Sequence, residues 1–415
     1  MLLDRSIAPV KQPIGKLSFS SPELIFFGDI PVMALENKDN GIISIEIHFE
    51  SGKGKEQTNG LSYLTTKMLN RGTEQLSASE ISKSFEELGS FFELISGIDH
   101  VTLKLHSLKK NFQKSLQLVS SVIQKSTLPE EELRRNQKIY AERIHQEMQK
   151  SSFTANVHFL EALFGNSHPY GKGYDIQSIL GLTRDQVLDF YTNKLFLNPK
   201  IVIVGDFSDQ IGDIEKELIQ LPFKKTDTIL THTLRKSKDI RVDKANNQAS
   251  IRVGSICMDR KSPTIHDLEI ADTLLGGYFG SRLMQNLREK KGLSYGVQSQ
   301  IYHFMNDSYW VISSEVNKEQ KEAALKAIEI EIQNLQEVSA ETEELDNLKN
   351  YAKGKLIGCT DSPFSFSQLF KPLFLCDIPF QYLNDYMERL DDISPKEILE
   401  VAANNFKIDT RVIVS

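Results

Sequence analysis

Apolar residues recur at helical spacing in the segment from Gly60 to Thr73. Leu61, Leu64 and Met68 fall at positions i, i+3 and i+7, which predicts a helix with one buried stripe. The face opposite this stripe carries four other residues, Tyr63, Thr66, Lys67 and Asn70. We expect Asn59 to cap the start of the helix and Gly72 to end it.

Other segments show equally clear local patterns. Ser77 and Glu80 form a capping box, which predicts a second helix that Gly89 ends. The segment 101–105 alternates apolar and polar residues, which predicts a strand with one face toward a core. Each half of the chain is expected to run strand, helix, helix, strand, strand, long helices and a final strand.

Three stretches of this pattern occur twice, in the same order, and each copy lies about half the chain length after the first. The matching stretches are 45–49 with 251–255, 131–133 with 343–345, and 183–188 and 201–204 with 394–399 and 412–414. Short helix and strand patterns recur by chance, but three ordered matches at nearly constant spacing indicate an internal duplication.

The duplication predicts an α+β fold with two similar domains that face each other across a cleft. Each domain is expected to be an antiparallel-rich sheet covered by helices on one side. We place the N-terminal domain at residues 1–221 and the C-terminal domain at residues 222–415. The polar stretch Pro222–Asp227 is the expected junction.

Composition narrows the class of protein further. The chain has 415 residues, 40% hydrophobic and 25% charged, as in ordinary globular proteins, and its net charge of −7 argues against a nucleic-acid partner. No segment approaches the roughly 18 apolar residues of a membrane span. We expect a cytoplasmic protein, or a periplasmic one if a leader was removed. The three cysteines, Cys257, Cys359 and Cys376, are odd in number and widely spaced, which predicts free thiols.

The helix at 60–73 resembles the active-site helix of the insulinase, pitrilysin and mitochondrial processing peptidase family, a group of zinc metallopeptidases called inverzincins. In that family a Gly-Leu-(Ser/Ala) entry leads into His-x-x-Glu-His, and a Gly-Thr follows. The three reactive positions here hold Tyr63, Thr66 and Lys67. Two neutral imidazoles and a carboxylate base perform the zinc chemistry, which these side chains cannot do. A lysine ammonium has no free lone pair and repels a dication.

The family's third zinc ligand is a Glu on a later helix. At the family's spacing this sequence has Arg143, and a shift of one residue would bring Glu142 there instead. A single carboxylate does not make a zinc site, so we expect no metal in this chain. Whether Lys67 and Arg143 fill the place of the metal stays open, because two cations there would need acidic neighbours such as Glu142.

A second motif, in residues 275–297, is intact. It resembles the family's second signature, with Gly276-Gly277, then Ser281-Arg282-Leu283, then Arg288 seven residues before Tyr295. The resemblance implies that Arg288 and Tyr295 reach the zinc site and hold the substrate carbonyl.

A guanidinium and a phenol are donors that can stabilise an oxyanion, and Gly276, Gly277 and Ser281 would line the path of the peptide. The alternative is structural: Arg288 as a solvated residue near a helix C-terminus, and Tyr295 as a half-buried strand residue. The segment His168-Pro169-Tyr170-Gly171 is similar to a turn common in the family, and we interpret it as structural.

The resemblance covers nearly the whole chain and leaves out only the N-terminal tail to about Leu17. It implies a non-catalytic subunit of a heteromeric peptidase. A homologous zinc-bearing partner subunit would supply zinc, its ligands and the base, and this chain would add Arg288 and Tyr295 in trans for unfolded peptide substrates. The alternatives are an inactive structural or peptide-binding homologue, and a self-dimer with its own chemistry at Tyr63 and Lys67.

Overall fold

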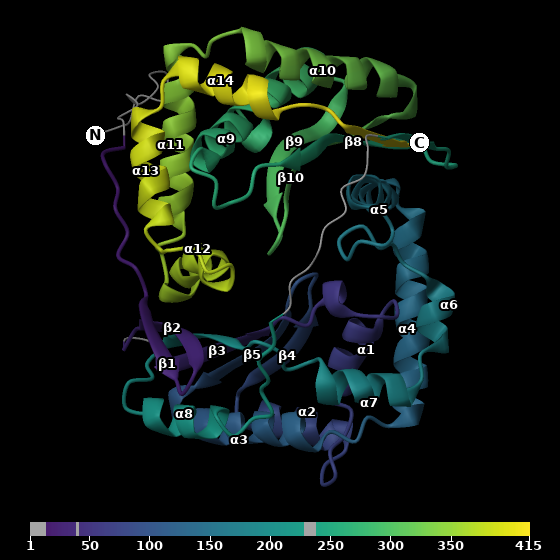
Figure 1. The fold of residues 1–415 in the computed structure, drawn as a ribbon, viewed down its shortest axis with the longest axis vertical. Coiled ribbons are helices and arrows are strands. Elements are labelled where there is room, and N and C mark those ends of the chain that lie inside the picture. Colours follow the sequence, from purple (N-terminus) through teal and green to yellow (C-terminus); the bar gives the residue numbers. More distant parts are fainter. Residues whose placement is uncertain (1–13, 39–40, 228–237) are drawn as a thin grey trace, which may run out of the picture.

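The computed structural model describes residues 14–38, 41–227 and 238–415. Two sheets, one in each half of the chain, face each other, and helices surround both of them (Figure 1). The N-terminal half is the lower half of Figure 1 and the C-terminal half is the upper half. The two-domain α+β prediction is confirmed.

The N-terminal sheet has six strands in the order β1-β2-β6-β3-β5-β4. The strands are β1 (Glu23–Phe27), β2 (Ile30–Glu36), β3 (Ile42–Phe49), β4 (Phe91–Ser96), β5 (Val101–Leu108) and β6 (Lys200–Gly205). The β2–β6 pair is parallel and the other pairs are antiparallel, so the sheet is mixed. The predicted strand at 101–105 is confirmed, and its side chains alternate between buried and half-buried.

The C-terminal sheet has five strands in the order β7-β11-β8-β10-β9. These strands are β7 (Lys238–Val242), β8 (Gln248–Cys257), β9 (Ser294–His303), β10 (Ser308–Asn317) and β11 (Thr410–Val414). Its pairings repeat those of β2, β6, β3, β5 and β4, including one parallel edge pair, β7 with β11. The same topology in both halves confirms the duplication.

Helices make up most of the remaining chain. In the N-terminal half they are α1 (Leu61–Met68), α2 (Ala78–Glu87), α3 (Lys109–Lys125), α4 (Glu130–Gln149), α5 (Ser151–Phe164), α6 (Ile176–Gly181), α7 (Arg184–Asn193) and α8 (Ile211–Leu218). In the C-terminal half they are α9 (Ile265–Asp272), the π-helical turns η2 (Thr273–Gly277) and η3 (Met284–Lys290), α10 (Lys321–Glu337), α11 (Thr342–Gly358), α12 (Pro363–Leu375), α13 (Tyr382–Asp392) and α14 (Pro395–Asn405). Capping boxes begin α2, α7 and α14, the last two at the repeated positions Thr183 and Ser394.

The two halves exchange helices. Helix α5 of the N-terminal half packs on β8 and β11, and α12, its counterpart in the repeat, packs on β6 and β2. Each sheet is therefore covered on both faces, which corrects our expectation of helices on one side only. Burial on both faces explains why every residue of β6 is buried.

Polar contacts fix α12 to the N-terminal sheet. The buried Lys200 of β6 donates from Nζ to the carbonyl oxygens of Phe374 (3.2 Å) and Leu375 (2.9 Å), and it pairs with Asp377 (2.7 Å). A lysine beside the last carbonyls of a helix satisfies acceptors that have no partner within the helix. The helix end is thus held from the opposite half of the molecule.

The N-terminal segment also joins the halves. Residues 1–13 of the tail lie outside the described residues, but from Ile14 onward the chain contacts the C-terminal half. The Ile14 N–H donates to Asn350 Oδ1 (3.1 Å), Lys353 Nζ donates to the Ile14 carbonyl (2.9 Å), and the Phe19 N–H donates to Asn384 Oδ1 (2.8 Å). None of the described helices is both long and apolar enough to cross a membrane.

Candidate functional site

Helix α1 carries the first motif, and its N-terminus is capped from outside the helix. The carboxylate of the buried Glu56 accepts from the backbone N–H groups of Gly60 and Ser62, both at 3.0 Å. Gly60 is the N-cap and has a left-handed backbone (φ +86°), which suits glycine. Our prediction of Asn59 as the N-cap is wrong, because its side chain instead donates to the Gly173 carbonyl (2.6 Å).

The predicted stripe of Leu61, Leu64 and Met68 is confirmed as buried. The helix ends at Met68, so Gly72 does not end it as we expected. Thr66, which we placed on the polar face, is buried too, and its hydroxyl donates to the Tyr63 carbonyl (2.7 Å). Among the four polar positions, Thr66 is therefore closed off from solvent.

The side chains of Tyr63, Lys67 and Arg143 form an aromatic and cationic cluster together with Tyr140. The rings of Tyr63 and Tyr140 stack with centroids 3.9 Å apart and an interplanar angle of 21°. The Arg143 guanidinium lies 4.7 Å from the Tyr63 ring centroid and donates to the Tyr63 hydroxyl (3.3 Å). Lys67 Nζ lies 5.7 Å from the same centroid. Among the described residues neither cation forms an ion pair with a carboxylate, and the ring face of Tyr63 stabilises both.

These residues do not fit a zinc ion. Guanidinium and ammonium groups offer no lone pair, and the tyrosine hydroxyl at position 63 already accepts a hydrogen bond from Arg143. Within the described parts of the chain, no group of three His, Cys, Asp or Glu side chains could hold a metal ion. Arg143, which the spacing placed opposite Tyr63 and Lys67, does lie beside them.

Arg288 of the second motif lies on η3 and faces solvent. Its side chain is 42% exposed, and its guanidinium lies 5.0 Å from the ring centroid of the exposed Phe279. In the described chain its acidic neighbour is Glu289, whose Oε1 is 3.7 Å from Arg288 Nε. A π-helical turn is rare and often marks a functional position, so this arginine sits on an unusual backbone.

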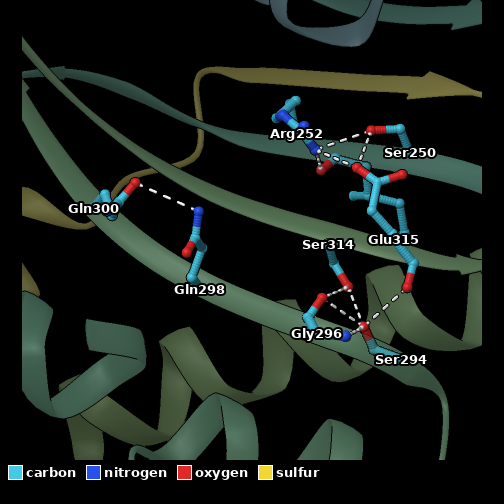
Figure 2. Close-up of polar contacts among 9 residues, drawn as sticks. Ser250, Arg252, Ser294, Gly296, Gln298, Gln300, Ser314 and Glu315 are labelled. Atoms are coloured by element: carbon cyan, nitrogen blue, oxygen red, sulfur yellow. Dashed lines mark hydrogen bonds and ion pairs between the residues drawn. The ribbon is translucent and has the colours of Figure 1, made fainter. Parts of the chain in front are cut away.

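Tyr295 projects from a β-bulge. In the β9–β10 pair Gly296 lies opposite Glu315 and Ser294 lies opposite Val316, so Tyr295 is the extra residue and is 65% exposed. Figure 2 shows how its neighbours are held: Ser294 Oγ lies 2.8 Å from Ser314 Oγ and 3.0 Å from the Glu315 carbonyl oxygen. Bulges commonly redirect a side chain near a functional site.

The small residues of the second motif are tightly packed. A Cβ added to Gly276 would lie 2.4 Å from the backbone nitrogen of Ser299, so this glycine lets η2 approach β9. Ser281 is fully buried, whereas Gly277 is half-buried. Close packing thus explains why small residues occupy positions 276 and 281. A role of Gly276, Gly277 and Ser281 in substrate binding stays a prediction.

The two motifs lie in different halves of the molecule. Across the described residues no hydrogen bond or ion pair joins Arg288 or Tyr295 to Tyr63, Lys67 or Arg143. The His168–Gly171 turn forms part of a contact between the halves, because the Tyr170 hydroxyl donates to Asp99 Oδ1 (2.7 Å) and the Met305 N–H donates to Asp99 Oδ2 (2.9 Å).

Sequence reasoning missed a cavity in the C-terminal half, bounded by α9, β9, α11, α12 and α13 and lined by apolar and charged side chains. Its volume is about 470 Å³, and its lining includes Glu269, Asp272, His303 and Lys355. No sequence motif marks these residues. The internal repeat could have identified three of them, because Glu269, Asp272 and Lys355 are the repeat counterparts of Tyr63, Thr66 and Arg143.

Comparisons with known proteins fit this architecture. Residues 32–168 match the family model described as insulinase (peptidase family M16), and residues 181–351 match the model described as the peptidase M16 inactive domain. The chain belongs to the peptidase M16 family. A crystal structure described as the peptidase M16 inactive domain from Pseudomonas fluorescens has the same fold, with a TM-score of 0.84 and 24% identity over 97% of this chain and 98% of that one.

M16 relatives differ in the activity that their names state. An uncharacterized zinc protease, YmxG of Bacillus subtilis, is 26% identical over 76% of this chain and 78% of its own length. In Helicobacter pylori the zinc protease PqqE is 24% identical over 90% of this chain and 87% of its own length. The non-peptidase homolog YmxG of the same organism is 21% identical over 89% and 87%. These matches support an inactive M16 homologue.

Proposed function

We propose that this chain is the non-catalytic subunit of a heteromeric M16 peptidase. It would bind unfolded peptide and place Arg288 and Tyr295 beside the active site of a zinc-bearing partner of the same family. The main support is a contrast between the two motifs. In the first motif the Tyr63 hydroxyl accepts from Arg143, and the Tyr63 ring contacts both Arg143 and Tyr140. In the second motif Arg288 and Tyr295 are exposed, and the described chain gives their side chains no comparable partner.

The exposed pair has the chemistry that peptide hydrolysis needs. As water attacks a peptide carbonyl, negative charge develops on the oxygen, and a guanidinium and a phenol can both donate hydrogen bonds to it. Neither side chain has a strong partner within the described chain: Arg288 Nε lies 3.7 Å from Glu289 Oε1, and the Tyr295 hydroxyl forms no hydrogen bond there. Their hydrogen-bonding capacity is therefore available to a ligand.

The test is co-purification of this chain with an M16 homologue that carries His-x-x-Glu-His, followed by a peptide-cleavage assay. The complex should cleave peptide, and the chain alone should neither cleave it nor hold stoichiometric zinc. Arg288→Ala and Tyr295→Phe should each lower kcat/KM of the complex about a hundredfold, as expected for the loss of one oxyanion donor.

Lys290→Ala is the matched control, because Lys290 is an exposed cation on the same helical turn as Arg288. It should leave kcat/KM unchanged, and all three variants should still bind the partner. Full activity in Arg288→Ala and Tyr295→Phe would refute the catalytic role. If no complex cleaves peptide, the chain is better explained as a structural or peptide-binding homologue. Zinc-dependent cleavage by the chain alone would contradict the proposal.

A further inference from the structure

The cavity in the C-terminal half occupies the position that corresponds, by the internal repeat, to the M16 zinc site. The alignment of β3 with β8, which pairs residues 45–49 with 251–255, carries Tyr63, Thr66 and Lys67 to Glu269, Asp272 and Thr273. The sequence of buried and half-buried positions in residues 62–69 recurs unchanged in residues 268–275, which supports this alignment.

The fourth position agrees as well. The alignment of α4 with α11, which pairs residues 131–133 with 343–345, carries Arg143 to Lys355. All four counterparts line the cavity. In the N-terminal half Lys67 and Arg143 lie against the Tyr63 ring. In the C-terminal half the four counterparts line an open space of about 470 Å³, within the usual range of small-molecule sites.

Two carboxylates lie in the wall of this cavity, that of the buried Asp272 and that of the half-buried Glu269. Glu269 accepts from the Tyr382 hydroxyl (2.8 Å) and lies 3.2 Å from His266 Nδ1. Burial would raise the pKa of Glu269, but the His266, His303 and Tyr382 side chains lower it to about 2, so the group is charged. Asp272 accepts a hydrogen bond from Ser299, and burial, together with the charge of Glu269, raises the pKa of Asp272 to about 7.

Other polar atoms of the cavity have no hydrogen-bond partner in the described chain. His303 is only 5% exposed, its Nδ1 lies 2.6 Å from Ser308 Oγ, and its Nε2 lies 3.5 Å from Glu269 Oε1 without forming a hydrogen bond. The buried Nε of Arg260 also lacks an acceptor. Among the described residues, neither Arg260 nor Lys355 forms an ion pair. A buried polar atom without a partner is costly, and a bound ligand would satisfy it.

The charges and apolar surface of this cavity are complementary to a ligand that has an ammonium group, a carboxylate and an apolar side chain. The carboxylates of Asp272 and Glu269 suit an ammonium group, and the unpaired cations Arg260 and Lys355 suit a carboxylate. Between them the wall is apolar and aromatic, with Leu356, Leu369 and Tyr386 contributed by α11, α12 and α13. From this arrangement we propose that the C-terminal half binds a free amino acid or short peptide with apolar side chains, its amine toward Asp272 and Glu269 and its carboxylate toward Arg260 and Lys355.

The test is isothermal titration calorimetry of the full chain, without any partner, against leucine, Leu-Leu and tri-leucine. N-acetylated and C-amidated forms of Leu-Leu serve as blocked ligands. At least one unblocked probe should bind, and each block should weaken binding of Leu-Leu about tenfold or more, because each removes a charge-assisted contact. Binding of leucine alone would identify amino acids as the ligands, and binding of the peptides alone would identify peptide termini.

Variants locate the binding. Asp272→Asn keeps the shape of the side chain and should weaken all unblocked probes about tenfold. Lys355→Ala, at an exposed position, should weaken Leu-Leu but leave its amide unchanged. Glu289→Gln, an exposed carboxylate outside the cavity, is the control and should bind as the wild type does.

No binding at millimolar ligand, equal binding of blocked and unblocked Leu-Leu, or normal binding by both cavity variants would overturn the proposal. None of these measurements depends on a zinc-bearing partner, so this inference can fail while the subunit role holds, and the reverse.

Discussion

Tyr63, the first reactive position of α1, lies flat on Tyr140 and accepts a hydrogen bond from Arg143. Residues 63 and 143 come from helices far apart in the sequence, yet their tips touch. The fold therefore brings position 143 of α4 beside positions 63 and 67 of α1.

This geometry predicts that zinc binding can be built back. Tyr63→His with Lys67→His provides two imidazoles one helical turn apart, and Arg143→Glu adds a carboxylate where a cation now lies. We expect the triple variant to hold about one zinc per chain after dialysis, measured by elemental analysis, and the double variant with Arg143 intact to hold far less. Equal zinc in both variants would show that Arg143 does not reach this place.

Asp272 predicts a pH dependence of stability. Its pKa is about 7 in the folded chain against 3.8 for the ordinary group, so the folded state holds the proton more tightly than the unfolded state. Its contribution to stability is complete below about pH 4 and is lost as the pH rises through 7. Asp272→Asn does not titrate, so the variant should gain stability relative to wild type between pH 4 and pH 8, by on the order of 1–4 kcal/mol.

Chemical denaturation at both pH values measures this difference. Asp267→Asn is a useful comparison, because Asp267 is a carboxylate on the same helix that pairs with Arg389. It should lose stability and show no comparable gain at high pH. A difference between wild type and Asp272→Asn that does not change with pH would mean that Asp272 is already ionised at pH 4.

Single residues also show why parts of the site escaped prediction. Asn59 has the right side chain for an N-cap, but Glu56 reaches the same N–H groups from a position that no local capping rule includes. No local pattern distinguishes Glu269 and Asp272 from ordinary surface acids of a helix. Their partners come from distant elements: Glu269 accepts from Tyr382 of α13, and Asp272 accepts from Ser299 of β9.

At the level of elements, local patterns were the reliable guide. The capping box predicted at Ser77 involves only neighbouring residues, and it begins α2. The structure has two further capping boxes, at Thr183 and Ser394, within the stretches that we used only as repeats. The exchange of α5 and α12 was missed, because the choice of sheet that an apolar helix covers is made by long-range packing. An apolar face specifies that it is buried but does not specify where.

The contacts between Lys200 and the end of α12 predict that this lysine contributes strongly to the stability of the folded chain. Lys200→Met should remove two hydrogen bonds to the last carbonyls of α12. The Phe374 carbonyl would keep its contact with the Asp377 N–H (3.3 Å), and the Leu375 carbonyl would lose its Lys200 donor. We expect a loss of about 1–3 kcal/mol in the free energy of unfolding, and faster amide exchange in α12. Lys216→Met, at an exposed position on α8, is the control and should change neither measurement. Unchanged exchange in α12 would contradict this role of Lys200.

At the level of the whole molecule, the Asp99 carboxylate ties a loop of the N-terminal half to the β9–β10 hairpin. Burial raises its pKa, and the Tyr170 and Met305 donors oppose that shift. Tyr170→Phe should weaken this contact by about 1 kcal/mol and increase hydrogen exchange in residues 303–307. Tyr191→Phe, whose hydroxyl binds only within the N-terminal half, should destabilise without that regional change.

The overall plan was predictable because duplication leaves a trace in the sequence. The repeated stretches indicated the two halves and the fold class, and the pairing order of the sheets agrees. The orientation of one half against the other was not predictable, since it depends on tertiary contacts such as Lys371 with Glu46 (2.9 Å), which join residues from opposite ends of the sequence.

The reciprocal placement of α5 and α12 has a practical consequence. Expressed separately, either half would carry a bare apolar helix and a sheet lacking its cover, and we expect such fragments to aggregate. Mixed during refolding, however, they should find one another, because each brings the missing piece of the other's interior. If the gene were split between the two halves, the products would therefore have to associate in order to fold and would not be two independent domains.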